Sequence, residues 1–280
     1  MSITSIWDMS HATQFYNDVV NFERCDDFST DFFCIAARRK YLDQKAKEHV
    51  KFGNTCMMHK TILKEYDVHK FQTKLLQADK IMDYFYDRDY NAIPRNCMVF
   101  YMNVNHTDVL KAMNDFETQL TSWHYDISSL MRFKNGNKVS NIAKQIKSVQ
   151  NSLLKSFQDP ANKVFRWIDI DCDLIKPFDP QTIKDHLTEI CGFWVPVIVT
   201  QGGVHCLVNA MSLTKYNSEI AASHDKREVK DLVLNPPKIV NMLKEFLDSK
   251  FIIYKECTFN QNAAVPIPGT MQNDFPVRMI

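Results

Sequence analysis

The sequence predicts an α+β fold, and two observations support this prediction. Between Lys60 and Tyr90, apolar residues recur near every 3.6 positions, which is typical of amphipathic helices. After Asp159-Pro160 the pattern changes to short apolar runs that alternate with helical segments. With 280 residues, 45% of them hydrophobic, the chain is long enough to bury a complete core.

Residues 1–95 are predicted to form a mainly helical N-terminal region. One or two long amphipathic helices are expected between Lys60 and Tyr90, and Pro94 ends the region. The remainder, residues 96–280, is predicted to be a sheet-based core. It begins with a buried strand at Cys97–Met102 and a helix from Val109 to about Leu120, which Thr107-Asp108 caps.

A basic segment follows. From Ile127 to Gln158 the chain has no acidic residue but six Lys or Arg residues, although the formal net charge of the whole chain is only +1. Apolar residues occupy one side of the expected helix, and Lys144, Lys147 and Lys155 lie on another. This ridge is either a solvated helix face or a surface that contacts nucleic-acid phosphates. Arg38, Arg39 and Lys40 form a second candidate of the same kind.

The last third of the chain is predicted to alternate strands and helices. Asp179-Pro180 begins a helix that Gly192 ends, and Asn235-Pro236-Pro237 begins another. Two strands joined at Gly202-Gly203 form an expected hairpin. The predicted strands of this region are 164–172, 194–199, 204–208 and 251–256, with a final extended segment at 276–280.

The strand at 164–172 carries the strongest functional signal. Side chains alternate along a strand, so Asp169, Asp171 and Asp173 are expected on one face and the intervening apolar residues on the other. Crowded carboxylates repel one another unless a cation neutralises them, and Mg²⁺ binds through one or two carboxylates together with substrate phosphates. The sequence therefore points to metal-assisted phosphoryl or nucleotidyl transfer.

A histidine follows the Gly-Gly turn. His205 lies near the start of the second hairpin strand, and strands adjacent in sequence are usually neighbours in space. It could donate a hydrogen bond to a triphosphate oxygen, while Gly202 and Gly203 would let the backbone approach such a ligand. The alternative is a core histidine whose partner is a backbone carbonyl.

Three segments together resemble the archaeo-eukaryotic primase superfamily, in its phage and plasmid primase-polymerase branch. They are Trp167-Ile168-Asp169-Ile170-Asp171, Thr200-Gln201-Gly202-Gly203-Val204-His205 and Val265-Pro266-Ile267-Pro268-Gly269-Thr270. An upstream segment, Tyr101-Met102-Asn103-Val104-Asn105 before a helix, is similar to the amino-terminal αβ unit of that family. The chain has Asn105-His106-Thr107 where the family often has Asn-Pro-Arg. The resemblance covers residues 100–280 and implies an open, RRM-like catalytic sheet.

The resemblance also implies template-directed primer synthesis by two metal ions, Mg²⁺ or Mn²⁺. In this reading Asp169 and Asp171 hold the ions, His205, Gly202 and Gly203 bind the incoming nucleotide, and Thr270 lines its pocket. The implied partners are a single-stranded DNA template, nucleoside triphosphates and a separate helicase. Template-backbone contacts are expected from Lys144, Lys147, Lys155, Arg38 and Arg39.

A departure from the family concerns the third metal-binding acid, since the expected position carries Asn260-Gln261-Asn262. Asn262 or Asn260 would fill the position as an uncharged ligand, or Glu256 or Asp274 would reach into the site. The missing acid motivates one alternative to primer synthesis, a catalytically impaired single-stranded nucleic-acid-binding protein of the same fold. Another alternative is a metal-dependent nuclease, because paired acids with a histidine also serve hydrolysis.

Cysteine usage and the absence of targeting signals predict a cytoplasmic protein, in a host cytoplasm if the chain is viral. The sequence has neither a signal peptide nor an apolar run long enough for a membrane span, so no membrane partner is expected. Its eight cysteines form no CxxC pair and are predicted to be buried free thiols. Cys56 and His59 have the spacing of half a zinc site, and no second half follows.

Overall fold

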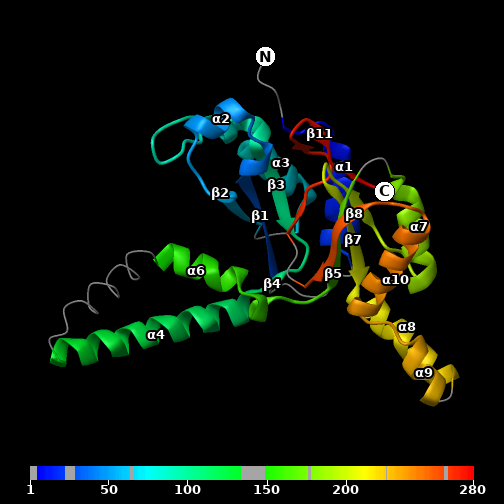
Figure 1. Cartoon of the computed structure of the whole chain (residues 1–280). Helices are drawn as coiled ribbons and strands as arrows, with labels where there is room; N and C mark the ends of the chain where they lie inside the picture. Colours follow the sequence, from blue (N-terminus) through cyan, green and yellow to red (C-terminus); the bar gives the residue numbers. More distant parts are fainter. Residues whose placement is uncertain are drawn as a thin grey trace. The chain divides into compact units, whose positions relative to one another are not determined.

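The computed structural model describes residues 5–22, 29–63, 66–133, 149–175, 178–224, 226–261 and 264–280. It is an α+β protein with antiparallel sheets and several helices (Figure 1), which confirms the predicted class at this level. The chain divides into two compact units. The first unit contains Met1–Arg24, Asp31–Asn105 and Phe165–Ile280, and the second contains Cys25–Thr30 and His106–Val164.

The first sheet of the first unit has the strand order β2-β1-β3-β9, and all neighbouring strands are antiparallel. Helices α1 and α3 contribute to the core cluster of this sheet, in which Phe33 meets Phe71 edge to face at 6.3 Å. The bounds are β1 Ser29–Arg38, β2 Thr55–Leu63, β3 Met98–Asn103, β9 Ala264–Pro266, α1 Met9–Phe15 and α3 Val68–Ile81. Short helical turns complete this part: η1 Tyr16–Val20, η2 Arg39–Tyr41, α2 Gln44–His49, η3 Met82–Tyr84 and η4 Arg95–Cys97.

Two strands thus lie in the region that was predicted to be mainly helical. Strand β1 is buried along most of its length, with both faces covered. Such a strand has a continuous apolar sequence and loses the alternation that distinguishes a strand from a buried helix. The helical signal between Lys60 and Tyr90 was correct only for α3, whose N-terminus is capped by the Asp67 side chain.

The second sheet of the first unit has the strand order β12-β6-β7-β5-β8, again with antiparallel neighbours. The predicted hairpin is present as β6 and β7. The predicted helix after Asp179 is α7, with Asp179 at its N-cap and Gly192 left-handed at its C-cap. Asn235 likewise caps α10. The bounds are β5 Trp167–Leu174, β6 Val197–Val199, β7 Gly203–Asn209, β8 Tyr254–Asn260, β12 Arg278–Met279, α7 Pro180–Cys191, α8 Ala210–Ser223, α9 Lys226–Leu232 and α10 Pro236–Ser249. A separate two-stranded ribbon pairs β10 Met271–Gln272 with β11 Phe275–Pro276.

The two faces of the second sheet have different environments. One face packs in a core cluster with residues of α7 and α10, which lie side by side in Figure 1. From the other face, Trp167, Ile198 and Leu207 join the core cluster of the first sheet. The acidic residues of β5 project from this second face, so they lie at the border of the core that the two sheets share.

The second unit is formed mainly by two helices that pack on each other, α4 (Val109–Phe133) and α6 (Val149–Gln158). Strand β4 (Thr107–Asp108) pairs with the first two residues of β1, and η5 (Pro160–Asn162) follows α6. The Thr107 hydroxyl donates to the Phe157 carbonyl at 2.7 Å, and the Lys163 ammonium donates to Thr107 Oγ1 at 2.6 Å. Helix α4 is longer than predicted. The predicted cap is confirmed at Asp108, whose side chain accepts from the Lys111 backbone nitrogen at 3.0 Å, although Thr107 and Asp108 also form a short strand.

The cysteines differ in part from their predicted state. Cys172 and Cys257 face each other on β5 and β8 and form a disulfide, so the prediction of eight free thiols is wrong for this pair. The other described cysteines are free: Cys34, Cys56, Cys97, Cys191 and Cys206. Cys56 is partly exposed, and the other four are buried.

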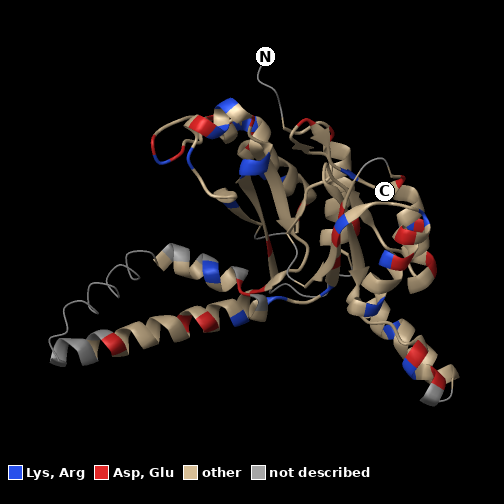
Figure 2. Ribbon diagram, in the orientation of Figure 1, with Lys and Arg blue, Asp and Glu red and all other residues tan. Residues whose placement is uncertain are grey.

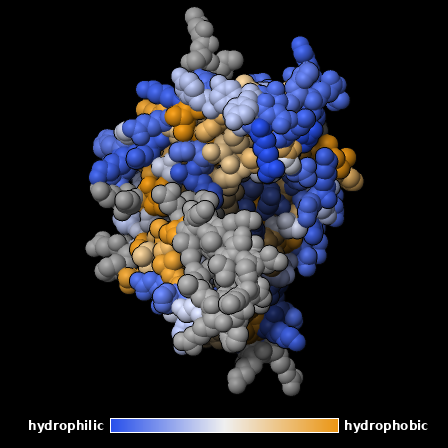
Figure 3. Space-filling model, turned by 90° about the vertical axis from the view of Figure 1, so that its left-hand side faces the viewer, coloured by the Kyte–Doolittle hydropathy of each residue, from blue (hydrophilic) through white to orange (hydrophobic). Residues whose placement is uncertain are grey.

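The surface view in Figure 3 shows a face on which hydrophilic residues predominate and apolar residues occur in separate patches. None of the helices in the described ranges combines the length and the apolarity that crossing a bilayer requires.

Candidate functional site

Strand β5 presents its three aspartates as the sequence predicted. Asp169, Asp171 and Asp173 alternate with Ile170 and Cys172, which are buried in the core beside α7 and α10. Asp169 is almost completely buried, with 3% of its surface exposed, whereas half of the Asp171 side chain is open. The strand is held on both sides, by β7 and by β8, so its carboxylates have fixed positions.

His205 lies directly opposite Asp171 in the pairing of β5 with β7. Its Nδ1 atom is 3.0 Å from Asp169 Oδ2 and 3.7 Å from Asp171 Oδ1. The imidazole therefore lies against both carboxylates, and we call Asp169, Asp171 and His205 the Asp–His cluster. The alternative that His205 is a core histidine bonded to a backbone carbonyl is wrong, since its described partner is a carboxylate.

The pKa values of His205 and Asp171 depend on the charges of their neighbours in the cluster. Burial by itself would lower the pKa of His205, but the charge and hydrogen bond of Asp169, with further contributions from Asp171 and Asp173, raise it to about 9. The imidazole is thus a cation at neutral pH. Burial raises the pKa of Asp171, and the like charges of Asp169 and Asp173 add to this, while His205 opposes it. One imidazolium therefore faces two carboxylates, a third lies one step along the strand, and the face keeps an excess of negative charge.

The Gly-Gly turn is explained by strand packing. A Cβ atom on Gly203 would lie 1.9 Å from the Cys172 carbonyl oxygen, and Gly203 adopts a φ of +153°. A Cβ on Gly202 would lie 3.5 Å from Asp173 Oδ1. Gly203 therefore lets β7 approach β5 closely, which sets the spacing between the imidazole and the carboxylates. The predicted role, close approach of a ligand, is replaced at Gly203 by close approach of the neighbouring strand.

The first sheet contributes positive charge and tyrosines near the carboxylates. Lys40 interacts electrostatically with Asp171 and lowers its pKa. The Arg38 guanidinium lies 5.8 Å from the centre of the Tyr101 ring. Burial raises the pKa of Tyr101 to about 12, with Arg38 opposing and Asp171 adding to the shift. Among the described ion pairs, neither Arg38 nor Lys40 bridges directly to an aspartate of β5.

Gln272 ties three segments together beside this group. Its side-chain nitrogen donates to the Tyr41 hydroxyl at 2.7 Å, and its oxygen accepts from the Gln201 backbone at 2.9 Å. The hairpin turn before His205 is thus connected both to β10 and to the segment that carries Lys40.

Asn105 anchors the start of β5. Its Oδ1 atom accepts from the backbone nitrogens of Arg166 and Trp167 at 2.9 and 2.7 Å, and its Nδ2 donates to the carbonyls of Trp167 and Gln261 at 2.8 and 2.7 Å. The side chain is fully buried. Asn105 therefore fixes where β5 begins, two residues before Asp169, and connects it to the end of β8.

The candidates for a third metal ligand lie in different parts of the chain, and only some share a face with the aspartates of β5. Asn260 lies opposite Asp169 and Glu256 lies opposite Asp173 in the pairing of β5 with β8, so both share the carboxylate face. Asp274 instead lies in the turn between β10 and β11, and Asn262 lies outside the described residues. Within the described ranges, no group of three or more His, Cys, Asp and Glu side chains is arranged to hold a metal ion.

The remaining predicted site residues lie elsewhere. Thr270 is fully buried and its hydroxyl donates to the Ile267 carbonyl at 2.6 Å, which gives it a role in the turn and leaves no surface for a nucleotide. The Arg39 guanidinium donates to the carbonyls of Lys47, Val50 and Phe52 and holds that loop. Lys155 is exposed on α6 in the second unit, and Lys144 and Lys147 lie outside the described residues.

Tyr101, Tyr41, Gln272 and the bonding role of Asn105 were not identified from the sequence. Tyr101 and Tyr41 belong to the first sheet and its adjoining turn, and no local pattern relates them to β5. A tyrosine or lysine in an apolar segment carries no signal of its eventual neighbour, because that neighbour is set by how two sheets pack.

The chain matches no protein-family profile, no curated protein and no solved structure.

Proposed function

We propose that the chain is a template-directed nucleotidyltransferase of the primase-polymerase type, with the Asp–His cluster as its catalytic centre. The observation that carries the proposal is the juxtaposition of Asp169 and Asp171 with the His205 imidazole on one face of an antiparallel sheet. In this proposal the RRM-like core of the primase superfamily corresponds to the second sheet with α7 and α10 behind it.

The donor set suits a hard divalent cation. Mg²⁺ is commonly bound by one or two carboxylates, with substrate phosphates and water completing its shell, so a protein group of three donors is not required. Asp169 and Asp171 would hold the metal, and Asn260 is the described neutral oxygen on the same face. Bound Mg²⁺ or Mn²⁺ would activate the primer 3′-hydroxyl and neutralise charge on the pyrophosphate leaving group.

His205 and the cations of the first sheet would bind the triphosphate. The Nδ1 atom of His205 faces Asp169, so its Nε2 would be the atom that donates to the triphosphate. Lys40 supplies positive charge near Asp171, and Arg38 lies over the neighbouring Tyr101 ring; neither pairs directly with Asp171 among the described ion pairs. A substrate with bound cations on one side and anionic phosphates on the other would match this distribution of charge.

The test is primer synthesis by the full chain on a single-stranded DNA template with nucleoside triphosphates and Mn²⁺. We expect short products from the native protein and none from the double variant Asp169→Ala with Asp171→Ala. A matched control removes two exposed aspartates, Asp185 and Asp248, in the same way and should keep full activity. Full synthesis by the β5 double variant would refute the assignment.

A second candidate is a single-stranded nucleic-acid-binding protein that has the same fold without the chemistry. The observation in its favour is that the described residues include no three-donor metal group. Salt-dependent strand binding without metal-dependent incorporation would support it. Degradation of the strand in the absence of nucleotides would instead indicate a metal-dependent nuclease.

A further inference from the structure

A pocket of about 640 Å³ lies outside the Asp–His cluster, between the beginning of β2 and a turn at residues 85–93. Its volume falls within the range of small-molecule sites, which is about 300–1,000 Å³. The wall combines apolar and aromatic side chains with two cations and two acids. The residues that matter for the argument are Phe52, Cys56, Tyr86, Arg88 and Lys51.

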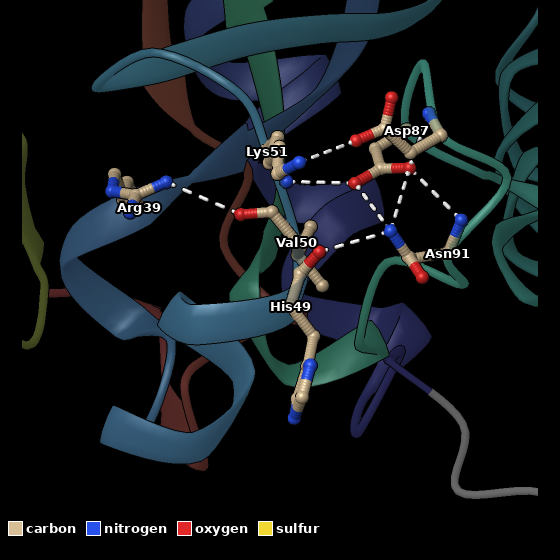
Figure 4. A network of polar contacts seen from close by, with 7 residues as sticks. Arg39, His49, Val50, Lys51, Asp87 and Asn91 are labelled. Atoms are coloured by element: carbon tan, nitrogen blue, oxygen red, sulfur yellow. Dashed lines mark hydrogen bonds and ion pairs between the residues drawn. The ribbon is translucent and has the colours of Figure 1, made fainter.

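The turn that forms one wall is held rigidly. Asp87 accepts hydrogen bonds from the backbone nitrogens of Lys51, Asp89 and Asn91, at 2.7 to 2.9 Å. These bonds lower the pKa of Asp87 to about 2. The Asn91 side chain donates to the His49 carbonyl, so the turn is tied to the loop before β2, as Figure 4 shows.

The same loop is fixed from its other side by Arg39, which donates to the carbonyls of Val50 and Phe52 at 3.3 and 3.1 Å. Both walls of the pocket are therefore preorganised by side chains that bind backbone atoms. A preorganised site loses little conformational entropy when a ligand binds.

The turn presents exposed tyrosine rings. Tyr86 in the pocket wall is 51% exposed, and Tyr90 at the tip of the turn is 87% exposed. Tyr90 has a φ of +63°, a left-handed conformation that bulky residues seldom adopt. The hydrogen bonds of this turn thus hold an exposed aromatic side chain in an unfavourable backbone conformation.

The charges of the wall leave one cation available. Lys51 is paired with Asp89 at 2.8 Å, and the Asp87 oxygens accept from the backbone and from Asn91. Arg88 is exposed and takes part in none of the ion pairs or hydrogen bonds found among the described residues. Figure 2 shows both signs of charge around α2 and the neighbouring turn, so the site is not a general anion-attracting surface.

We infer that this pocket binds a nucleotide unit, with the base stacked on Tyr86 and a phosphate on Arg88. An aromatic ring and a guanidinium in one pocket wall match a flat aromatic base joined to an anion, and every base has a face that can stack. The ligand is either a free nucleotide or one residue of a single strand, because both offer the same chemistry. The inference does not depend on the catalytic role of the Asp–His cluster, since none of the residues used belongs to it.

Cys56 supplies a built-in probe, because it lines the pocket and is partly exposed. The rate of Cys56 alkylation would be followed by peptide mass spectrometry, with the full chain carrying Asp169→Asn and Asp171→Asn and with chelator present. This background removes binding at the Asp–His cluster, so failure here is distinguishable from failure of the proposed function. The probes are AMP, ATP and an oligothymidylate.

We expect protection of Cys56 and about tenfold weaker binding for Tyr86→Ala and for Arg88→Gln, as the loss of one stacking or phosphate contact implies. Tyr84→Ala and Lys80→Gln are the matched controls, because both residues are exposed and neither lines the pocket. Protection by AMP or ATP identifies a free nucleotide, and protection by the oligonucleotide alone identifies a strand. No protection by any probe, or protection that Tyr86→Ala retains in full, overturns the inference.

Discussion

Asp87 and the aspartates of β5 use the same functional group in opposite ways. The Asp87 carboxylate accepts from three backbone nitrogens and from Asn91, and these donors lower its pKa to about 2. Asp171 is surrounded by Asp169 and Asp173, and burial with these like charges raises its pKa. The described partner of Asp169 is an imidazole that is itself titratable.

The difference separates a carboxylate whose hydrogen bonds hold a turn from carboxylates for which we propose a functional role. Fixed neutral donors satisfy the charge of Asp87 in the folded chain, so this carboxylate needs no added cation. The carboxylates of β5 are satisfied only in part, by one imidazolium, and the surplus negative charge favours an added cation. Burial and hydrogen-bond partners therefore distinguish the two, while residue type does not.

The largest expected effect is on nucleotide incorporation, and its absence would contradict the contrast between Asp87 and the aspartates of β5. Asp171→Asn should reduce metal-dependent nucleotide incorporation at least about 100-fold, because it removes a charge that would hold the metal. Asp87→Asn should change incorporation less than about twofold, since that carboxylate holds a turn outside the Asp–His cluster. The measurement is the initial rate of primer extension with Mn²⁺ for the two variants side by side. Equal losses in both would remove the distinction.

Asn105 is an uncharged, fully buried side chain that binds backbone groups, as Asp87 does at the surface. Asn105→Ala leaves three buried backbone groups at the start of β5 and the part-buried Gln261 carbonyl without their partner, so we expect a loss of about 3–5 kcal/mol in the free energy of unfolding. Urea unfolding measures this loss. The control is Asn114→Ala on an exposed position of α4, which should cost less than about 0.5 kcal/mol. A small effect at Asn105 would mean that β5 is positioned by its strand pairing alone.

The spacing between β5 and β7 offers a sharper test. Gly203→Ala places a methyl group against the Cys172 carbonyl, and the required backbone shift should cost about 2–4 kcal/mol in the free energy of unfolding. Gly53→Ala is matched, because a Cβ there meets no atom within 4 Å. Denaturant midpoints of the two variants measure the difference. Equal midpoints would show that the close approach at Gly203 is not required.

The smallest expected effect concerns pH. The folded pKa of His205, about 9, lies above its unfolded value near 6.5, so its ion pair stabilises the fold fully below pH 6.5 and loses this effect as pH rises through 9. We expect His205→Gln to cost about 1–3 kcal/mol at pH 6 and much less at pH 10, in chelator. Unfolding curves at several pH values measure this. A cost that is independent of pH would show that the imidazole is not charged in the fold.

The sequence by itself determined the features that depend on residues close together in the chain. The caps at Asp179 and Asn235, the left-handed Gly192 and the alternation of aspartates along β5 all depend on residues within one or two turns of the chain. The helical reading of residues 1–95 failed at β1, because a strand covered on both faces has the continuous apolar pattern of a buried helix.

The tertiary structure alone decided which groups meet. Strands β5 and β7 are separated by α7 and β6 in the chain, and their register brings His205 to Asp171. The packing of the two sheets brings Lys40 and Tyr101 into the field of the same carboxylates, and long-range hydrogen bonds make Asn105 the anchor of β5. Contacts between distant segments arise from burying apolar faces against each other, and no local pattern of polar residues encodes that choice.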